Sequence, residues 1–165
     1  MRRIKGQIAV EYIIFISVLL LFFQAIVFPN ITFSENVVND IYQATQTKQS
    51  VEKLANDISS FASSSGFGKR TVYFYLPSKG RIINCTDVGG IYNIQYSVDI
   101  SPQNPRPPIA NCSYDAVKNV VVCNYSKSVY MGGGNLTCPA NIGPGYNGYL
   151  VIEKFNNGDV NVSFP

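Results

Sequence analysis

Residues Lys5–Phe28 read KGQIAVEYIIFISVLLLFFQAIVF, and this stretch decides how the rest of the chain is organised. No charged residue occurs from Tyr12 to Ser34. A helix needs roughly 20 mostly apolar residues to cross the hydrocarbon core of a bilayer, so this run is long enough to span one. A single carboxylate, Glu11, stands at the head of the run. Because an ionisable group inside a bilayer costs free energy unless it is paired or solvated, Glu11 is a candidate functional residue.

The segment before the apolar run is short and basic, and the positive-inside rule keeps such an end in the cytoplasm. An ordinary secretory signal is cleaved after its apolar core, at small residues. Here the core ends in Gln-Ala-Ile-Val-Phe-Pro, which is a poor site of that kind. The small residue with polar neighbours is Gly6, so we predict cleavage between Gly6 and Gln7. Cleavage there removes residues 1–6 as a leader and leaves a largely protonated amine on Gln7.

This N-terminal pattern resembles the class III signal peptide of archaeal type IV pilins. The matching features are Lys5, Gly6, Gln7, Ala9, Glu11 and the apolar run after Tyr12. Two positions depart from the family pattern, because Ala9 stands where Ser is common and Phe15 where Leu is common. Both replacements keep the size class or the hydrophobicity of the family residue.

The resemblance implies that a leader peptidase processes the chain and that the apolar helices of many copies bundle into a filament core. It also implies that the amine of Gln7 pairs with Glu11 of a neighbouring subunit and so sets the axial register. The residues alone leave two alternatives open. The amine and Glu11 could pair within one helix, where the dipole favours Glu near the N-terminus. An uncleaved signal anchor would instead leave Glu11 in the lipid headgroup region.

The helix is expected to continue beyond the apolar run with a different character. Pro29 lacks the N–H of a helical hydrogen bond, so a kink or break is expected there. Over residues 31–64, apolar residues such as Val37, Ile41 and Ile58 recur at three- and four-residue steps opposite polar ones. This amphipathic part should pack on a globular domain or on neighbouring copies. The sequence Ser-Ser-Ser-Gly-Phe-Gly after it predicts a domain boundary. The helix is therefore expected over 7–65, and its part 7–28 is expected to lie in the membrane or the filament core. The second domain is expected over 66–165.

Residues 66–165 carry the signals of β structure. The segment 71–76 is rich in β-branched and aromatic residues, and with 81–85 it is expected to form a hairpin around Pro-Ser-Lys-Gly. Further strands are predicted over 92–100, 111–114, 119–125, 149–155 and 159–164. The last two flank Asn-Asn-Gly, the clearest hairpin signal in the chain. The expected fold class is therefore α+β, a long N-terminal hydrophobic helix followed by a small antiparallel β-sheet or β-sandwich domain.

The composition excludes several classes of function. The chain has 13 basic and 10 acidic residues, and removal of the leader with its three basic residues leaves ten of each sign. That balance lacks the basic footprint that nucleic-acid binding needs, so no nucleic-acid partner is expected. There is no histidine, and neither a close carboxylate pair nor a dinucleotide-binding fingerprint occurs. We therefore expect no enzymatic activity and no cofactor or metal.

The four cysteines all lie in the part of the chain expected outside the cell. They are Cys85, Cys112, Cys123 and Cys138. An even number of cysteines in an exported domain predicts two disulfides, with three possible connectivities. The 111–125 hairpin would bring Cys112 and Cys123 near each other. A zinc site is the alternative, but the chain has no histidine and no Cys-x-x-Cys pair.

The chain is also rich in Asn-x-Ser/Thr sequons, which matter on an exported surface. Their asparagines are Asn30, Asn84, Asn111, Asn124, Asn135 and Asn161. Such a number exceeds the chance expectation from the composition, so we expect at least two to be N-glycosylated. The alternative is that Asn, Ser and Thr are simply common in turns and strands.

These features together predict a structural subunit of a cell-surface filament. The chain would be a single-pass membrane protein before assembly, with its N-terminus cytoplasmic and its C-terminal domain extracellular, and would then form a helical homo-oligomer. The alternative is a minor pilin with an adhesive function, or a monomeric membrane-anchored binding domain.

Overall fold

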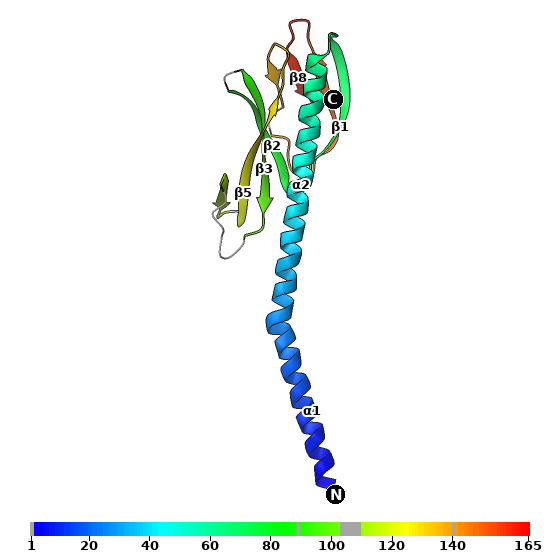
Figure 1. The fold of residues 1–165 in the computed structure, drawn as a ribbon, viewed down its shortest axis with the longest axis vertical. Helices are drawn as coiled ribbons and strands as arrows, with labels where there is room; N and C mark the ends of the chain where they lie inside the picture. Colours follow the sequence, from blue (N-terminus) through cyan, green and yellow to red (C-terminus); the bar gives the residue numbers. More distant parts are fainter. Residues whose placement is uncertain (1, 89, 103–109, 140) are drawn as a thin grey trace. The chain divides into compact units, whose positions relative to one another are not determined.

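The computed structural model describes residues 2–88, 90–102, 110–139 and 141–165, with side chains from Ala9 onward. A helical region comes first and is built from α1 (Arg2–Phe22), the π-helical turn η1 (Phe23–Val27) and α2 (Phe28–Ser63). Eight strands follow (Figure 1): β1 (Gly68–Tyr75), β2 (Gly80–Val88), β3 (Ile91–Ile100), β4 (Cys112–Asp115), β5 (Val120–Val129), β6 (Leu136–Thr137), β7 (Asn147–Lys154) and β8 (Val160–Ser163). The α+β fold class predicted from the sequence is confirmed.

The chain divides into two compact units, Met1–Asn39 and Asp40–Pro165. The first unit is helical. The second contains all eight strands together with the last turns of α2. The strands thus begin after the boundary predicted from composition, whereas the compact unit that contains them already begins at Asp40.

Helical backbone continues through Pro29, and the irregularity lies directly before it. Proline has no N–H to donate to the carbonyl four residues back, and its ring crowds that carbonyl. In η1 the backbone adopts the wider π-helical bonding, and the N–H of Phe28 donates to the carbonyl of Phe23. The side-chain amide of Asn30 donates to the carbonyl of Ile26 at 2.7 Å. The helix therefore accommodates the proline by a local change of hydrogen bonding.

The strands form two four-stranded sheets. The first sheet has the order β1-β7-β8-β6, and the second sheet has the order β2-β3-β5-β4. All pairings are antiparallel except the short β6–β8 pairing, which is parallel. One isolated bridge joins Ile82 of β2 to Ile142.

Two predicted hairpins are confirmed and one is wrong. The β7–β8 hairpin around Asn-Asn-Gly and the β4–β5 hairpin have the expected antiparallel pairing. The segments 71–76 and 81–85, predicted to pair, instead lie in different sheets, because β1 pairs with β7 and β2 with β3. The turn between them bonds to a distant segment, since the N–H of Leu76 donates to Tyr146 and that of Gly145 donates to Pro77.

The hydrophobic core of the second unit forms around the C-terminal half of α2. Its helical members are Val51, Leu54, Ala55, Ile58 and Ala62. They share one cluster with buried residues of both sheets, among them Ile94 and Ile152, which are fully buried. In Figure 1 the upper turns of α2 run alongside the strands of both sheets. The amphipathic pattern of this part of the helix thus marks a core-packing face.

Three polar contacts join α2, from Asp40 onward, to the strands or to the segments next to them. The buried carboxylate of Asp40 accepts hydrogen bonds from the ammonium of Lys79 and from Ser101. Arg70 of β1 lies 3.4 Å from the carboxylate of Asp57. The ammonium of Lys154 donates to the carbonyls of Ala62 and Ser64, which satisfies acceptors at the end of the helix and places a positive charge at the negative pole of its dipole.

Candidate functional site

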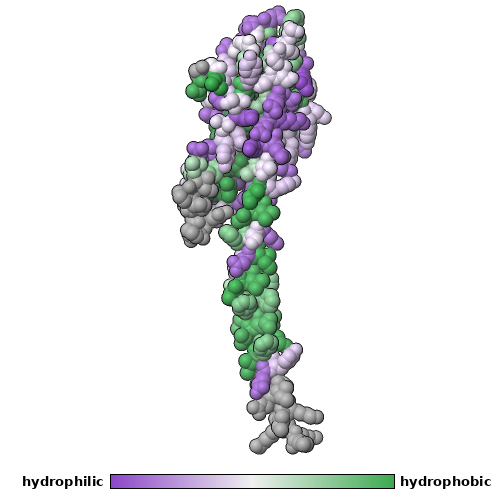
Figure 2. All heavy atoms as spheres, in the orientation of Figure 1, coloured by the Kyte–Doolittle hydropathy of each residue, from purple (hydrophilic) through white to green (hydrophobic). Residues whose placement is uncertain are grey.

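The apolar segment, residues 9–33, presents large hydrophobic side chains to its surroundings on every side of the helix. Tyr12 and Leu21 are each 64% exposed, and exposed apolar side chains recur from Val10 to Phe33. The visible face of this segment in Figure 2 is almost wholly hydrophobic. It belongs to a helix that is long and apolar enough to cross a bilayer, and the apolar part is not buried by the rest of the chain.

Polar side chains in and beside this segment turn back onto their own helix. Ser17 donates to the carbonyl of Ile13 at 2.8 Å, Thr32 to that of Phe28 at 3.1 Å, and Ser34 to that of Asn30 at 2.9 Å. Each bond spans four residues and removes a donor that apolar surroundings would leave unsatisfied. The segment therefore suits either lipid or the apolar surface of other helices.

Exposure of this segment to water would be costly. Full burial of one large apolar side chain is worth about 1.5–3 kcal/mol, so covering the whole segment is worth on the order of tens of kcal/mol. That far exceeds the net stability of a typical domain, about 5–15 kcal/mol. The segment thus requires an apolar environment that this chain does not itself provide.

Glu11 interrupts this apolar surface. It lies on α1, is exposed, and has no ion pair with any described side chain. Gly6 and Gln7, the predicted processing site, lie one turn before it in the same helix. Since residues four apart in a helix are neighbours, a free amine on Gln7 would lie on the same side of the helix as Glu11.

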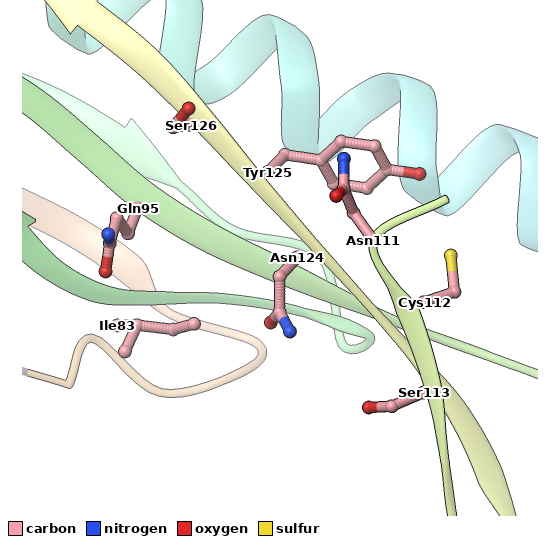
Figure 3. A pocket seen from close by; sticks show the side chains of 8 residues that line it. All are labelled: Ile83, Gln95, Asn111, Cys112, Ser113, Asn124, Tyr125 and Ser126. Atoms are coloured by element: carbon pink, nitrogen blue, oxygen red, sulfur yellow. The ribbon is translucent and has the colours of Figure 1, made fainter. Parts of the chain in front are cut away.

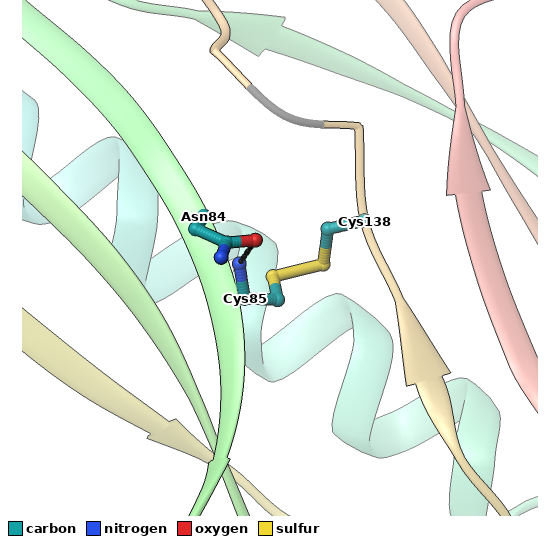
Figure 4. Close-up of a disulfide and its surroundings, with 3 residues drawn as sticks. All are labelled: Asn84, Cys85 and Cys138. Atoms are coloured by element: carbon teal, nitrogen blue, oxygen red, sulfur yellow. Dashed lines mark hydrogen bonds between the residues drawn. A yellow bond between two sulfur atoms is a disulfide. The ribbon is translucent and has the colours of Figure 1, made fainter.

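The two disulfides have distinct positions in the second unit. Cys85 of β2 pairs with Cys138, which follows β6, and their Cα atoms lie 5.7 Å apart (Figure 4). This bond joins the second sheet to the segment directly after β6 of the first sheet. Cys112 pairs with Cys123, directly opposite it in the β4–β5 hairpin. No described cysteine is free.

The six sequons differ in how available their side-chain amides are. Asn30 uses its amide nitrogen to bond the helix backbone within the apolar segment. Asn135 accepts a hydrogen bond from Tyr92 and donates to Asp159, and Asn161 is half-buried in β8. The remaining three are exposed and belong to the second sheet or its immediate flank: Asn84, Asn111 and Asn124.

A groove of about 860 Å³ lies on the second sheet (Figure 3). Two of the exposed sequon residues, Asn111 and Asn124, line it together with Gln95, Ser113 and Ser126. None of the side chains that line it carries a charge. Amides and hydroxyls both donate and accept hydrogen bonds, so the groove suits a neutral polar ligand. Sequence patterns alone did not indicate this groove, since it depends on the register of β3 with β5.

Among the residues that the structure describes, no three His, Cys, Asp or Glu side chains gather in a way that could hold a metal ion. In comparisons with known proteins, no family model, no curated protein and no solved structure matches this chain. The functional argument therefore rests on the apolar segment, Glu11 and the surface of the second unit.

Proposed function

We propose that this protein is a structural subunit of an archaeal type IV pilus-like cell-surface filament. The observation that carries the proposal is the apolar segment, which is exposed all around the helix and has hydroxyls bonded to its own backbone. Such a helix is soluble in a bilayer and equally in a bundle of identical helices. It thereby suits a subunit that moves from membrane to filament.

The order of events follows from the charges at the N-terminus. The basic leader holds that end in the cytoplasm while residues after the apolar segment are exported. A leader peptidase then cuts between Gly6 and Gln7 and leaves the apolar segment attached to the domain. The new amine of Gln7 and the carboxylate of Glu11 carry opposite charges. In the bundle, the amine of one subunit pairs with Glu11 of the next, and this pairing selects one axial register.

The second unit becomes the outer surface of the filament in this proposal. Its two disulfides suit an oxidising compartment outside the cell. Exposed sequons on one sheet suit an exported glycoprotein.

The test is to shear filaments from cells that express the full chain and to sequence the N-terminus of the protein they contain. We expect an abundant subunit that begins at Gln7. A surface form that begins at Met1, or after Phe28, would contradict the proposal.

A second candidate function is a minor pilin with an adhesive role, or a monomeric membrane-anchored binding domain. The observation that favours it is a pair of exposed tyrosines on adjacent strands of the first sheet. Tyr73 and Tyr149 pack edge to face at 5.7 Å and are 49% and 56% exposed. Aromatic side chains placed in this way are common in binding surfaces. Only a trace of the protein in sheared filaments, or none, would favour this candidate.

A further inference from the structure

The outer face of the second sheet is polar, and the pairing of its strands defines which side chains share it. Gln95 pairs with Ser126, and Ser97 pairs with Asn124. Since alternate residues of a strand point to opposite faces, these four share the face opposite Ile94, Tyr96 and Val98. Those three residues are buried in the core. The groove of Figure 3 includes this polar face, since Gln95, Asn124 and Ser126 line it, and Cys112 and Tyr125 also belong to its lining.

Three polar side-chain atoms on this face of the sheet have no hydrogen-bond partner among the described residues. The hydroxyl of Ser97 is buried, with only 1% of the residue exposed, although Ser97 pairs with Asn124 at the groove. Oδ1 of Asp99 and Nε of Arg81 are likewise buried without a hydrogen-bond partner. The other carboxylate oxygen, Oδ2 of Asp99, accepts a hydrogen bond from a terminal nitrogen of Arg81 at 2.5 Å.

Three sequons converge on this polar face. Asn84 pairs with Gln95 across β2 and β3, and the backbone N–H of Asn124 donates to the carbonyl of Asn111 at 2.9 Å. The middle residues of the Asn84 and Asn111 sequons are Cys85 and Cys112, which are both in disulfides. The middle residue of the Asn124 sequon is Tyr125, which stacks on Tyr96 on the other face of the sheet. Of these three sequons, only that of Asn124 has a middle residue outside a disulfide, although Cys123, directly before Asn124, is bonded to Cys112.

We propose that Asn124 is the principal N-glycosylation site and that its own glycan lies in the groove on the second sheet. The first sugars would be held by the side chains of Gln95, Asn111 and Ser113, which can donate to and accept from sugar hydroxyls. Asn30, Asn135 and Asn161 stay unmodified, because their amides are bonded or partly buried. This proposal rests on the export that the proposed function requires.

The transfer forms a bond between Nδ2 of Asn124 and the anomeric carbon of the first sugar. It breaks the bond between that carbon and a phosphate oxygen of a lipid-linked oligosaccharide donor. The lipid phosphate leaves with the electron pair, and the proton that the amide nitrogen loses ends on that phosphate. A membrane-bound transferase supplies the catalysis, so the chain itself provides only the acceptor and the surface on which the glycan lies.

The first experiment maps glycopeptides of the full chain purified from the surface of its native cells. We expect the peptide with Asn124 to carry a glycan on most copies and the peptide with Asn135 to carry none. An unmodified Asn124 on exported, processed protein would overturn the inference and leave the filament proposal intact. Protein that is never exported would instead remove the basis of both.

The second experiment tests the position of the glycan in the groove. The sequon is removed by Asn124→Gln and, independently, by Ser126→Ala, and the thermal midpoint of unfolding is compared with that of the glycosylated chain. We expect both variants to lose a few degrees. In a Gln95→Ala background the same removal should change the midpoint much less.

The matched control is Gln49→Ala, because Gln49 is an exposed glutamine on α2 and does not line the groove. In the Gln49→Ala background, removal of the sequon should lower the thermal midpoint of unfolding by as much as it does in the unaltered chain. If the loss in the Gln95→Ala background equals that in the Gln49→Ala background, the glycan does not lie on Gln95 and its placement in the groove is wrong.

Discussion

The ammonium of Lys79 lies 2.5 Å from Oδ1 of Asp40, and this ion pair ties α2 to the turn between β1 and β2. Oδ2 of Asp40 accepts the backbone N–H of Ser101 at 2.9 Å. The Asp40 side chain is only 5% exposed, whereas that of Lys79 is 28% exposed. The two partners therefore differ in how easily each could return to water.

Lys79→Met should destabilise the domain more than Asp40→Asn does. Without the lysine, the buried carboxylate keeps only Ser101 as a partner among the described residues. Breaking a buried pair costs about 3–5 kcal/mol. Because Lys79 is partly exposed, we expect about 2–3 kcal/mol for Lys79→Met. In Asp40→Asn the lysine can turn toward solvent. Urea unfolding of the full chain in detergent measures both. The control is Lys69→Met, which breaks the surface pair with Glu153 and should change the free energy of unfolding by less than about 1 kcal/mol.

Gly80→Ala should destabilise the domain, and a second substitution should relieve it. A Cβ at position 80 would lie 2.7 Å from Cγ2 of Thr47, a fully buried residue of α2. Overpacking of this kind costs about 1–3 kcal/mol. Thr47→Ala removes the obstructing atoms, so the double variant should recover most of the loss. Equal stability of the single and double variants would show that the approach of β2 to α2 is not tight.

The two disulfides should contribute unequally to stability. Loop-closure entropy grows with the length of chain enclosed. The sequence separations are 53 residues for Cys85–Cys138 and 11 for Cys112–Cys123. The chain-entropy relation then gives about 4 kcal/mol for the first and about 3 kcal/mol for the second. Replacing each pair by alanine and measuring thermal unfolding tests the order.

The presence of both disulfides is tested by mass. Intact mass should rise by four hydrogens on reduction, and a thiol that labels without reduction would contradict two disulfides.

Glu11→Gln should impair filament formation while processing stays normal. The substitution removes the charge that the proposed pairing with the Gln7 amine needs, and it leaves the apolar segment and Gly6 unchanged. In a bundle core, the unpaired amine would cost about 3–5 kcal/mol per subunit. Imaging of surface filaments, after N-terminal sequencing confirms cleavage, measures the effect. The control is Glu35→Gln, since Glu35 is an exposed carboxylate beyond the apolar segment. Normal filament numbers for Glu11→Gln would remove the assembly role of Glu11.

Stability should fall at alkaline pH partly because of Tyr96. Burial raises the pKa of this hydroxyl above its ordinary 10.0, and Glu52 and Tyr125 raise the pKa further. The unfolded chain then loses this proton before the folded chain does. The contribution is therefore complete below pH 10 and is lost as the pH rises through the folded pKa. Tyr96→Phe should flatten the decline of the unfolding free energy above pH 10, whereas Tyr149→Phe, at an exposed tyrosine, should not.

The apolar helix was predictable because its signal is local, but the buried face of α2 was predicted only in part. Ile41 fits the apolar periodicity and yet is 61% exposed. Asp40 takes the buried position instead, and Thr47 and Val51 continue the same face of the helix. A carboxylate can be buried there because Lys79 and Ser101 supply its donors. Periodicity cannot reveal partners so distant in the sequence.

The strand pairings show a similar limit. An Asn-Gly turn fixes its own hairpin, so β7 and β8 were found from short-range signals. The turn after β1 looks equally local, but Pro77 and Gly80 are buried and Pro77 accepts the N–H of Gly145. In the structure, β1 and β2 lie in separate sheets on either side of this turn. The sequons were likewise legible in the sequence, whereas their convergence on one face required the pairing of β3 with β5.

The position of β8 between β7 and β6 has a consequence for biosynthesis. Of the four strands in that sheet, this central one leaves the ribosome last. Its Val160 and Val162 are almost completely buried, and β6 has no other strand partner among the described residues. In a nascent chain, β7 and β6 therefore lack the strand that joins them until residues 160–163 have been synthesised. A chain that stops before residue 160 lacks β8, so β7 and β6 cannot be joined in one sheet. Such prematurely terminated chains should be degraded by proteases.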